Sequence, residues 1–137
     1  MIFVLHSSVA LAWCFADKQT PGLLSLLEHL RLTVAAAPQI WPLELLDGFR
    51  AAENGGKLTQ APHRLLRSLL RRLPVEFDGQ PVEQSLDAIT RLADRFELNS
   101  RQATYLELAQ RRDLPLATLD PRLAIAAKGL RISLLDT

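Results

Sequence analysis

Two polar residues follow apolar runs at the places where a parallel sheet would hold its chemistry. His6 comes directly after the run 2–5, and Asp120 follows the run 114–119. Strands that alternate with helices favour a parallel sheet, and such sheets gather function outside the carboxyl ends of strands, where the strand order reverses. Imidazole and carboxylate groups are ligands for divalent metal ions. We therefore expect His6 and Asp120 to lie at the functional edge of the sheet.

The candidate residues each have a structural explanation beside a functional one. Asp120 precedes a proline, as a helix N-cap does. Glu44 falls in the first turn of an expected helix, where the helix dipole favours an acid, and Asp47 could form an ion pair one turn on. Gln102 has the spacing of a capping box, and His6 at a strand end is often a hydrogen-bonded structural histidine. None of these residues alone is specific for a metal site.

Short apolar runs alternate with amphipathic stretches along the whole chain. The expected strands cover residues 2–5, 33–37, 74–77, 114–119 and 132–135. The expected helices cover residues 9–15, 82–96, 100–112 and 121–128, with further helices that begin at Thr20-Pro21, at Trp41-Pro42 and at a Thr59 cap. This alternation predicts the α/β class, with a parallel sheet covered by helices on both faces.

Length and composition exclude several classes of protein. The 137 residues suit one domain, and 48% apolar with 23% charged residues argues against a disordered or fibrous chain. A formal net charge of +1 argues against a polycationic nucleic-acid coat. The single Cys14 fits a reducing compartment. The apolar start of the chain has no positively charged n-region and is too short to span a membrane, so we expect a cytoplasmic protein without a membrane partner.

Four segments taken together carry a family resemblance. They are Phe3 to Trp13 (FVLHSSVALAW), Trp41 to Glu44 (WPLE), Gln102 to Ala109 (QATYLELA) and Leu114 to Asp120 (LPLATLD). In this order and spacing they resemble PIN-domain proteins, and in particular the VapC-type toxins of bacterial toxin–antitoxin pairs. The resemblance covers essentially the whole chain, so we expect residues 1–137 to form a single PIN-like domain.

The resemblance implies a three-layer α/β/α sandwich with a five-stranded parallel sheet and an acidic pocket at the strand ends. In the family, four acids hold Mg²⁺ or Mn²⁺ ions that activate water for attack on an RNA phosphodiester. Hard carboxylate oxygens suit Mg²⁺, and a bound ion lowers the pKa of its water. The implied activity is that of a metal-dependent endoribonuclease, a hydrolase.

This sequence departs from the family at two of the four acidic positions. Glu44 and Asp120 match family acids and are the candidate catalytic and metal-binding residues. The first family acid is replaced by His6 and the third by Gln102. Asp47 stands at the next polar position of the family and could supply a further charge. The supporting hydroxyl positions are matched by Ser8 and Thr118.

Two hypotheses follow from this half-degenerate set. In the first, His6 supplies a nitrogen and Gln102 a carbonyl oxygen, so that metal binding and an attenuated ribonuclease activity survive with a preference for Mn²⁺ over Mg²⁺. In the second, no metal binds, because a protonated His6 between Glu44 and Asp120 neutralises both carboxylates. The chain would then be a catalytically inactive PIN module that binds RNA or an antitoxin-like protein partner.

A response-regulator receiver is the alternative from another class of protein. Such a domain needs paired acids after its first strand, a phosphoacceptor after its third and a late lysine. The chain has Asp78 and Lys128 at the last two places but no paired acids beside His6. The sequence therefore favours the PIN-like interpretation.

Surface patterns suggest two further kinds of partner. Arginines follow one side of the expected helix 59–73, namely Arg64, Arg67, Arg71 and Arg72, and could contact an RNA backbone. A basic solvated face on an amphipathic helix is common and is the stronger explanation of these arginines. The family resemblance further implies a homodimer, and a groove between neighbouring leucine-rich helices that receives an antitoxin segment.

Overall fold

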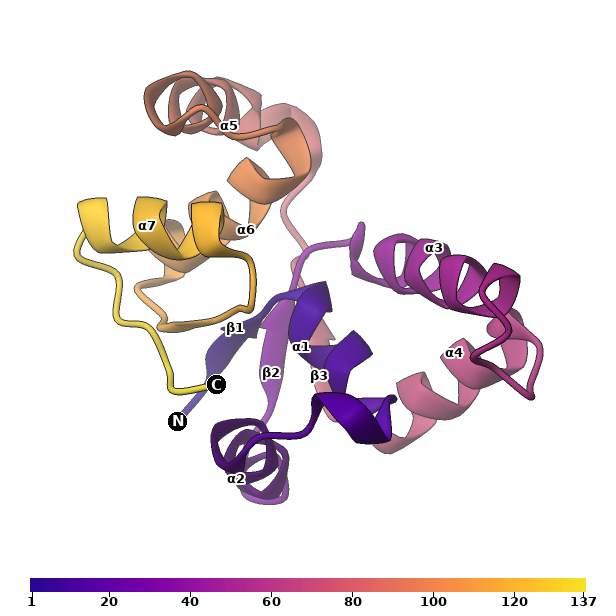
Figure 1. Ribbon diagram of the computed structural model, residues 1–137. Coiled ribbons are helices and arrows are strands. Elements are labelled where there is room, and N and C mark those ends of the chain that lie inside the picture. Colours follow the sequence, from indigo (N-terminus) through magenta and orange to yellow (C-terminus); the bar gives the residue numbers. More distant parts are fainter.

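A computed structural model describes residues 1–137 as four short strands and seven α-helices (Figure 1). The strands are β1 (Phe3–Leu5), β2 (Ala35–Ala37), β3 (Val75–Phe77) and β4 (Leu116–Ala117). The helices are α1 (Ser7–Trp13), α2 (Pro21–His29), α3 (Trp41–Asn54), α4 (Pro62–Arg72), α5 (Val82–Phe96), α6 (Ser100–Arg112) and α7 (Pro121–Gly129), with a 3₁₀ turn, η1 (Ala16–Lys18). No helix combines the length and apolarity that crossing a membrane requires.

The four strands form one parallel sheet in the order β3-β2-β1-β4. Phe3 pairs with Ala35 across β1 and β2, and Val4 pairs with Leu116 across β1 and β4. The order runs one way from β1 to β3 and reverses at β4, so the crevice beyond the ends of β1 and β4 is the expected place for a ligand. A receiver would place β3 beside β1, so this order argues against the receiver alternative.

Helices cover both faces of the sheet in two groups. α1 packs against α2 and α3, and α3 against α4, while α5 and α7 both pack against α6. In Figure 1 these groups lie on either side of the strands, with α3 and α4 extending away as a pair. Every residue of β1 and β2 is buried, which explains why their sequences carry no polar alternation. This arrangement is a three-layer α/β/α fold and is consistent with the PIN-like fold that the resemblance implies.

The expectation of five strands is wrong. The segment 132–135 meets the sheet at one isolated bridge, between Leu116 and Leu134. β4 itself has only two residues, which gives a fifth strand almost nothing to pair with. The segment 132–135 reaches β4 after a sharp turn in which Arg131 adopts a left-handed φ of 58°. The sheet therefore has four strands, with residue 134 as a single contact at its edge.

Helix starts are the other point of difference. Thr59 was the expected cap of the fourth helix, but α4 begins at Pro62 with Ala61 at the N-cap. Proline at the first helical position has a suitable φ and gives up an N–H that has no partner there. The first helix begins at Ser7 with His6 at its N-cap, ahead of the expected start at residue 9. The expected bounds of α5 and α6 are confirmed.

Candidate functional site

The site is built where β1 and β4 end side by side. The backbone N–H of His6 donates to the carbonyl oxygen of Ala117 at 3.0 Å, so the two chain segments leave the sheet together. His6 then caps α1, and Asp120 caps α7. The strand-end rule therefore places both residues at the same edge, as the sequence predicted.

His6 is held by Ser8 in a hydrogen-bonded turn. The Nδ1 atom of His6 lies 2.7 Å from Ser8 Oγ and accepts a longer hydrogen bond from the Ser8 backbone N–H. The Ser8 hydroxyl also accepts from the N–H of Leu119 at 2.9 Å, so its own proton points to the imidazole. The structural explanation of His6 is thus confirmed, and its Nδ1 lone pair is already in use.

Asp120 has hydrogen-bond donors on both of its carboxylate oxygens. Its Oδ1 accepts from the backbone N–H groups of Arg122 and Leu123 at the start of α7, as an N-cap does. Its Oδ2 accepts from Gln102 Nε2 at 2.8 Å. The backbone N–H of Asp120 donates to Thr118 Oγ1 at 3.0 Å. The carboxylate is therefore fixed by neutral groups of the chain itself.

Gln102 performs two roles with one amide. Its Oε1 accepts from the Asn99 backbone N–H at 3.0 Å and completes the expected capping box of α6. This bond fixes the direction of the amide, so that its NH₂ group faces Asp120. A carboxylate at position 102 could accept the Asn99 bond but could not donate to Asp120. The amide thus supplies a hydrogen-bond donor where the family has an acid.

Tyr105 joins Glu44 to His6, and sequence reasoning missed it. Its hydroxyl donates to Glu44 Oε1, and its ring packs edge-on against the His6 ring with centroids 4.5 Å apart. Tyr105 is fully buried, one helical turn beyond Gln102 on α6. The i, i+3 spacing from Gln102 was the available signal, because it places both side chains on one helix face.

Burial and hydrogen bonding set the charges of the site. Burial lowers the pKa of His6 to about 4, although the nearby Asp120 opposes this change. Burial would raise the pKa of Asp120, but hydrogen bonds from Gln102 and from the start of α7 outweigh it and lower that pKa. Burial, with the charge of Glu44, raises the pKa of Tyr105. His6 is therefore neutral near pH 7 and cannot act as the internal cation considered from sequence.

The donor set does not fit a Mg²⁺ or Mn²⁺ ion. Such ions need several oxygen ligands converging on one point, and no three His, Cys, Asp or Glu side chains come together in this way. Asp120 is occupied by Gln102 and α7, Glu44 by Tyr105, and the Nδ1 of His6 by Ser8. Asp47 is exposed and makes no hydrogen bond, so it supplies no replacement charge.

The arginines of α4 lie away from this network. Arg64, Arg67 and Arg71 are exposed and make no ion pair. They share the helix with an apolar side that packs toward α3 and toward an open groove. Their arrangement matches a solvated basic face and leaves RNA contact as a prediction.

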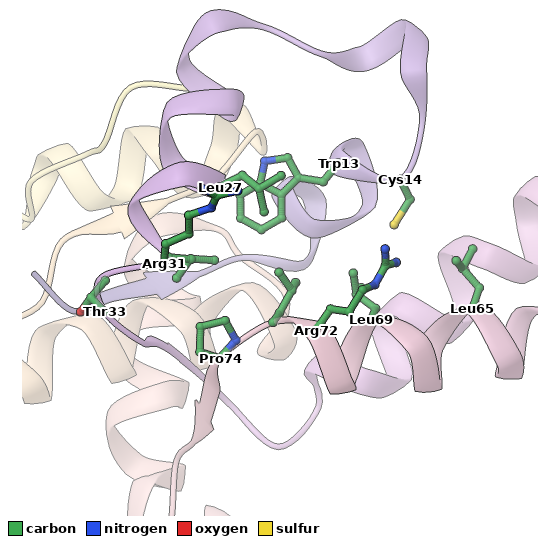
Figure 2. Close-up of a pocket in the computed structure, with 11 residues that line it drawn as sticks. Trp13, Cys14, Leu27, Arg31, Thr33, Leu65, Leu69, Arg72 and Pro74 are labelled. Atoms are coloured by element: carbon green, nitrogen blue, oxygen red, sulfur yellow. The ribbon is translucent and has the colours of Figure 1, made fainter.

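The groove has a volume of about 770 Å³ and lies at the opposite ends of the strands from the candidate site (Figure 2). Thr33 precedes β2 and Pro74 precedes β3, so these lining residues mark the amino ends of those strands. Apolar side chains from α1, α2 and α4 form its walls, namely Trp13, Leu27, Leu30, Leu65, Leu69 and Leu73. Arg31 and Arg72 add positive charge to this lining.

Comparisons with known proteins agree with the fold. PAE2754 from Pyrobaculum aerophilum is 22% identical and superposes with a TM-score of 0.62, covering 94% of this chain and 90% of that chain. FitAcB from Neisseria gonorrhoeae is 21% identical with a TM-score of 0.70, covering 99% of this chain and 97% of that chain. No family model matches the sequence, and no curated protein matches it. The structural likenesses support the PIN-like fold and, at this identity, nothing finer.

Proposed function

We propose that this chain is a PIN-like module that does not cut RNA through bound metal and acts instead by binding a protein partner of the antitoxin kind. The hydrogen-bond network at the strand ends is the observation that supports the absence of metal-dependent RNA cleavage. The two acids that match the family pattern each have a donor from within the chain, Tyr105 for Glu44 and Gln102 for Asp120. A metal ion held by both acids would have to compete with these bonds.

The groove supports the second half of the proposal. Its walls are apolar, and the Trp13 indole N–H already donates to the carbonyl of Leu23 at 2.8 Å, which leaves the ring available for packing. Arg72 forms no ion pair within the chain. Arg31 has only an exposed contact with Glu28 at 3.4 Å. An amphipathic segment with apolar side chains and an acidic residue is the occupant that complements this lining.

Peptide binding tests the groove directly. Two short helical peptides with the same apolar face, one with acidic and one with basic polar residues, serve as probes. We expect the acidic peptide to bind about fivefold more tightly, since one charge pair of this kind contributes roughly 1 kcal/mol. Cys14 lines the groove and is the only thiol, so bound peptide should also slow its alkylation by a maleimide.

A charge reversal provides the matched control for this experiment. Arg72→Glu should invert the preference between the two peptides, whereas Arg64→Glu on the same helix but outside the groove should leave it unchanged. Failure of both peptides to protect Cys14, or a preference that Arg72→Glu does not alter, would contradict the proposed occupant. Binding of single-stranded RNA that Arg64→Glu weakens would instead favour the arginine face of α4 as the partner surface.

An attenuated endoribonuclease is the second candidate function. The observation in its favour is that Glu44 and Asp120 lie at the strand-order reversal, and that Glu44 Oε2 accepts no hydrogen bond. If the site opens, the His6 nitrogen would favour Mn²⁺ over Mg²⁺. This candidate predicts slow RNA cleavage in Mn²⁺ that Glu44→Gln abolishes. Cleavage that persists in Glu44→Gln, or its absence in wild-type protein, would reject it.

From the resemblance to VapC-type toxins we further propose that the chain forms a homodimer and is cytoplasmic. Several large apolar side chains are exposed, including Leu24, Leu32 and Leu43. A dimer would bury part of this surface. Light scattering at micromolar concentration should give twice the 15.3 kDa chain mass. A monodisperse monomer would contradict the dimer without affecting the closed site.

A further inference from the structure

The outer edge of β3 is open. β3 is the last strand of the sheet on its side, it pairs with β2 alone, and no other element makes extensive contact with it (Figure 1). The carbonyl oxygen of Pro74 accepts from β2 at 2.9 Å, and the Asp78 N–H donates to the carbonyl oxygen of Ala37 at 2.9 Å. Backbone groups of a strand point to alternate sides, so the N–H and C=O groups of Val75 and Phe77 face away from β2.

None of these four outward groups has a partner within the chain. The backbone hydrogen bonds of β3 all run to β2, and the nearest side-chain bond ends one residue further on, where Gln39 donates to the carbonyl oxygen of Asp78. A proline blocks a sheet edge only when its missing N–H would face outward. Position 74 faces β2, so Pro74 leaves the edge free. A row of unpaired backbone groups is a template for another strand.

Negative charge gathers on the side of the edge that faces α6. Arg112 lies 3.3 Å from Glu76 Oε1. Arg111 contacts both Asp78 and Glu107, so three carboxylates share two guanidinium groups. Glu76 is the most exposed of the three, with 53% of its side chain accessible. A partner strand that placed a lysine or arginine beside Glu76 would therefore gain a favourable cross-strand charge pair.

The other side of the edge is apolar. Val75 and Phe77 point to this side, because side chains alternate along a strand. Both are partly exposed and pack against the core. The Phe77 ring lies 6.1 Å from the ring of Trp41 at the start of α3, measured between centroids. A partner strand with apolar or β-branched side chains at these positions would extend this packing.

A second copy of the chain does not complement this edge. In an antiparallel pair the outward groups of Val75 would bond to those of Phe77 in the other copy, which sets Glu76 directly opposite Glu76. Like charges directly opposite each other are destabilising. The edge therefore favours a different chain, with a basic residue where this one has Glu76.

We propose that the outer edge of β3 binds an extended segment of a partner protein. The segment adds a strand to the sheet, places a lysine or arginine beside Glu76, and places apolar side chains beside Val75 and Phe77. Its backbone supplies the hydrogen bonds that the edge lacks, and its side chains supply the selectivity. This surface is distinct from the lining of the groove and from the residues around Asp120, so it goes beyond the proposed function.

A short peptide and its methylated forms test the added strand. The probe is the capped peptide Thr-Val-Lys-Val-Thr, and a version with glutamate in place of lysine measures the charge preference. We expect the lysine peptide to bind about threefold more tightly, as one exposed cross-strand charge pair predicts. Methylation of both valine amides removes the donors that an antiparallel strand uses, and methylation of the lysine amide removes the donor that a parallel strand uses. Only one of these two methylated peptides should lose binding, and its identity gives the direction of the strand.

Variants of the chain test the same contacts from the other side. Glu76→Lys should invert the preference between the lysine and glutamate peptides, whereas Glu53→Lys, at an exposed glutamate on α3, should leave it unchanged. Val75→Pro removes an outward donor without touching the bonds to β2 and should abolish binding. If Val75→Pro does not fold, Glu76→Lys and the methylated peptides still decide the question. Arg72→Glu, which tests the groove, should not change binding of this peptide, so failure of the edge and failure of the groove are told apart.

Amide hydrogen exchange measured by NMR gives the direct readout. The Val75 and Phe77 amides should exchange fast in the free chain and about tenfold more slowly with saturating lysine peptide, while the Glu76 amide, which faces β2, should not change. The proposal is overturned if neither amide gains protection, if both methylated peptides bind alike, or if Glu76→Lys leaves the preference unaltered. Protection in the free chain that is lost on dilution would assign the edge to a second copy and would also overturn it.

Discussion

The two ends of the parallel strands differ in how far the chain satisfies its own side chains. At the carboxyl ends, Glu44, Tyr105, Gln102 and Asp120 hydrogen-bond to one another, to the backbone or to both. At the amino ends, α1, α2 and α4 enclose a groove of about 770 Å³ with apolar walls, and Arg72 in its lining forms no ion pair. The strand-end residues are thus largely satisfied from within the chain, whereas the groove leaves a charged side chain without an ion pair.

Measurements of the unfolding free energy can test this difference between the two ends of the strands. Substitutions in the hydrogen-bonded network should lower it strongly, whereas substitutions in the open groove should change it little. Polar groups that lose a buried partner cost free energy, whereas exposed side chains without contacts cost little. Four substitutions, at His6, Asp120, Tyr105 and Arg72, measure this difference.

The largest effect is the pH dependence that His6 contributes. Its pKa is about 4 in the folded chain against 6.5 for a free histidine. The unfolded chain therefore binds a proton first, so this stability is fully present above pH 6.5 and is lost as the pH falls toward 4. At 1.36 kcal/mol per unit the loss is about 3 kcal/mol. Urea unfolding at several pH values measures it.

His6→Asn is the matched variant for that measurement. Asparagine is a good N-cap and keeps an acceptor near the position of Nδ1, but it does not titrate. The difference in unfolding free energy between wild type and variant should shrink or change sign as the pH falls from 7 to 4. A difference that stays constant over this range would mean that His6 is not buried in its neutral form.

Loss of the Asp120 cap should come next. Asp120→Ala removes two backbone acceptors at the start of α7 and the partner of Gln102, and should lower the unfolding free energy by about 2 kcal/mol. Asp87→Ala on the exposed side of α5 is the control and should cost almost nothing. Equal effects of the two substitutions would argue against the network.

Removal of the Tyr105 hydroxyl should have a smaller effect. Tyr105→Phe keeps the ring against His6 but deprives Glu44 of its donor, at a cost of about 1 kcal/mol because Glu44 is half-buried and can gain water. Glu44→Ala removes the acceptor of this hydrogen bond. A double-mutant cycle between the two positions should give a coupling energy above zero, and additive effects would show that the bond contributes nothing.

The groove should be the least sensitive region. Arg72→Glu changes the charge of an exposed side chain that has no ion pair, so the unfolding free energy should move by less than about 0.5 kcal/mol. The same variant should invert the peptide preference described above. A large loss of stability would mean that Arg72 belongs to the fold and not to a binding surface.

The sequence predicted where the site residues lie better than it predicted their hydrogen-bond partners and charges. His6 and Asp120 could be placed together because the ends of β1 and β4 follow from apolar runs and a general rule of parallel sheets. Gln102 could be placed on a capping box because its spacing from Asn99 is local. Tyr105 could not be given its role, because the partner of a buried hydroxyl depends on which helix packs beside α6.

The remaining errors have the same physical origin. The prediction of a fifth strand was wrong because that strand would have to pair with β4, which has only two residues. The length of β4 is set by tertiary packing and cannot be read from the apolar pattern. The start of α4 moved from Thr59 to Pro62 because two local signals competed. The pKa of His6 also lay beyond the sequence, since it depends on burial that only the folded chain determines.

Calorimetric titration of wild-type protein with Mn²⁺ at pH 7.5 tests the closed site most directly, with the double variant His6→Asp/Gln102→Asp as positive control. The double variant restores four acids and should bind Mn²⁺ and gain thermal stability from it. We predict that wild-type protein shows no saturable binding and no change in unfolding temperature. Stoichiometric Mn²⁺ binding to wild type that Asp120→Ala removes would contradict the account.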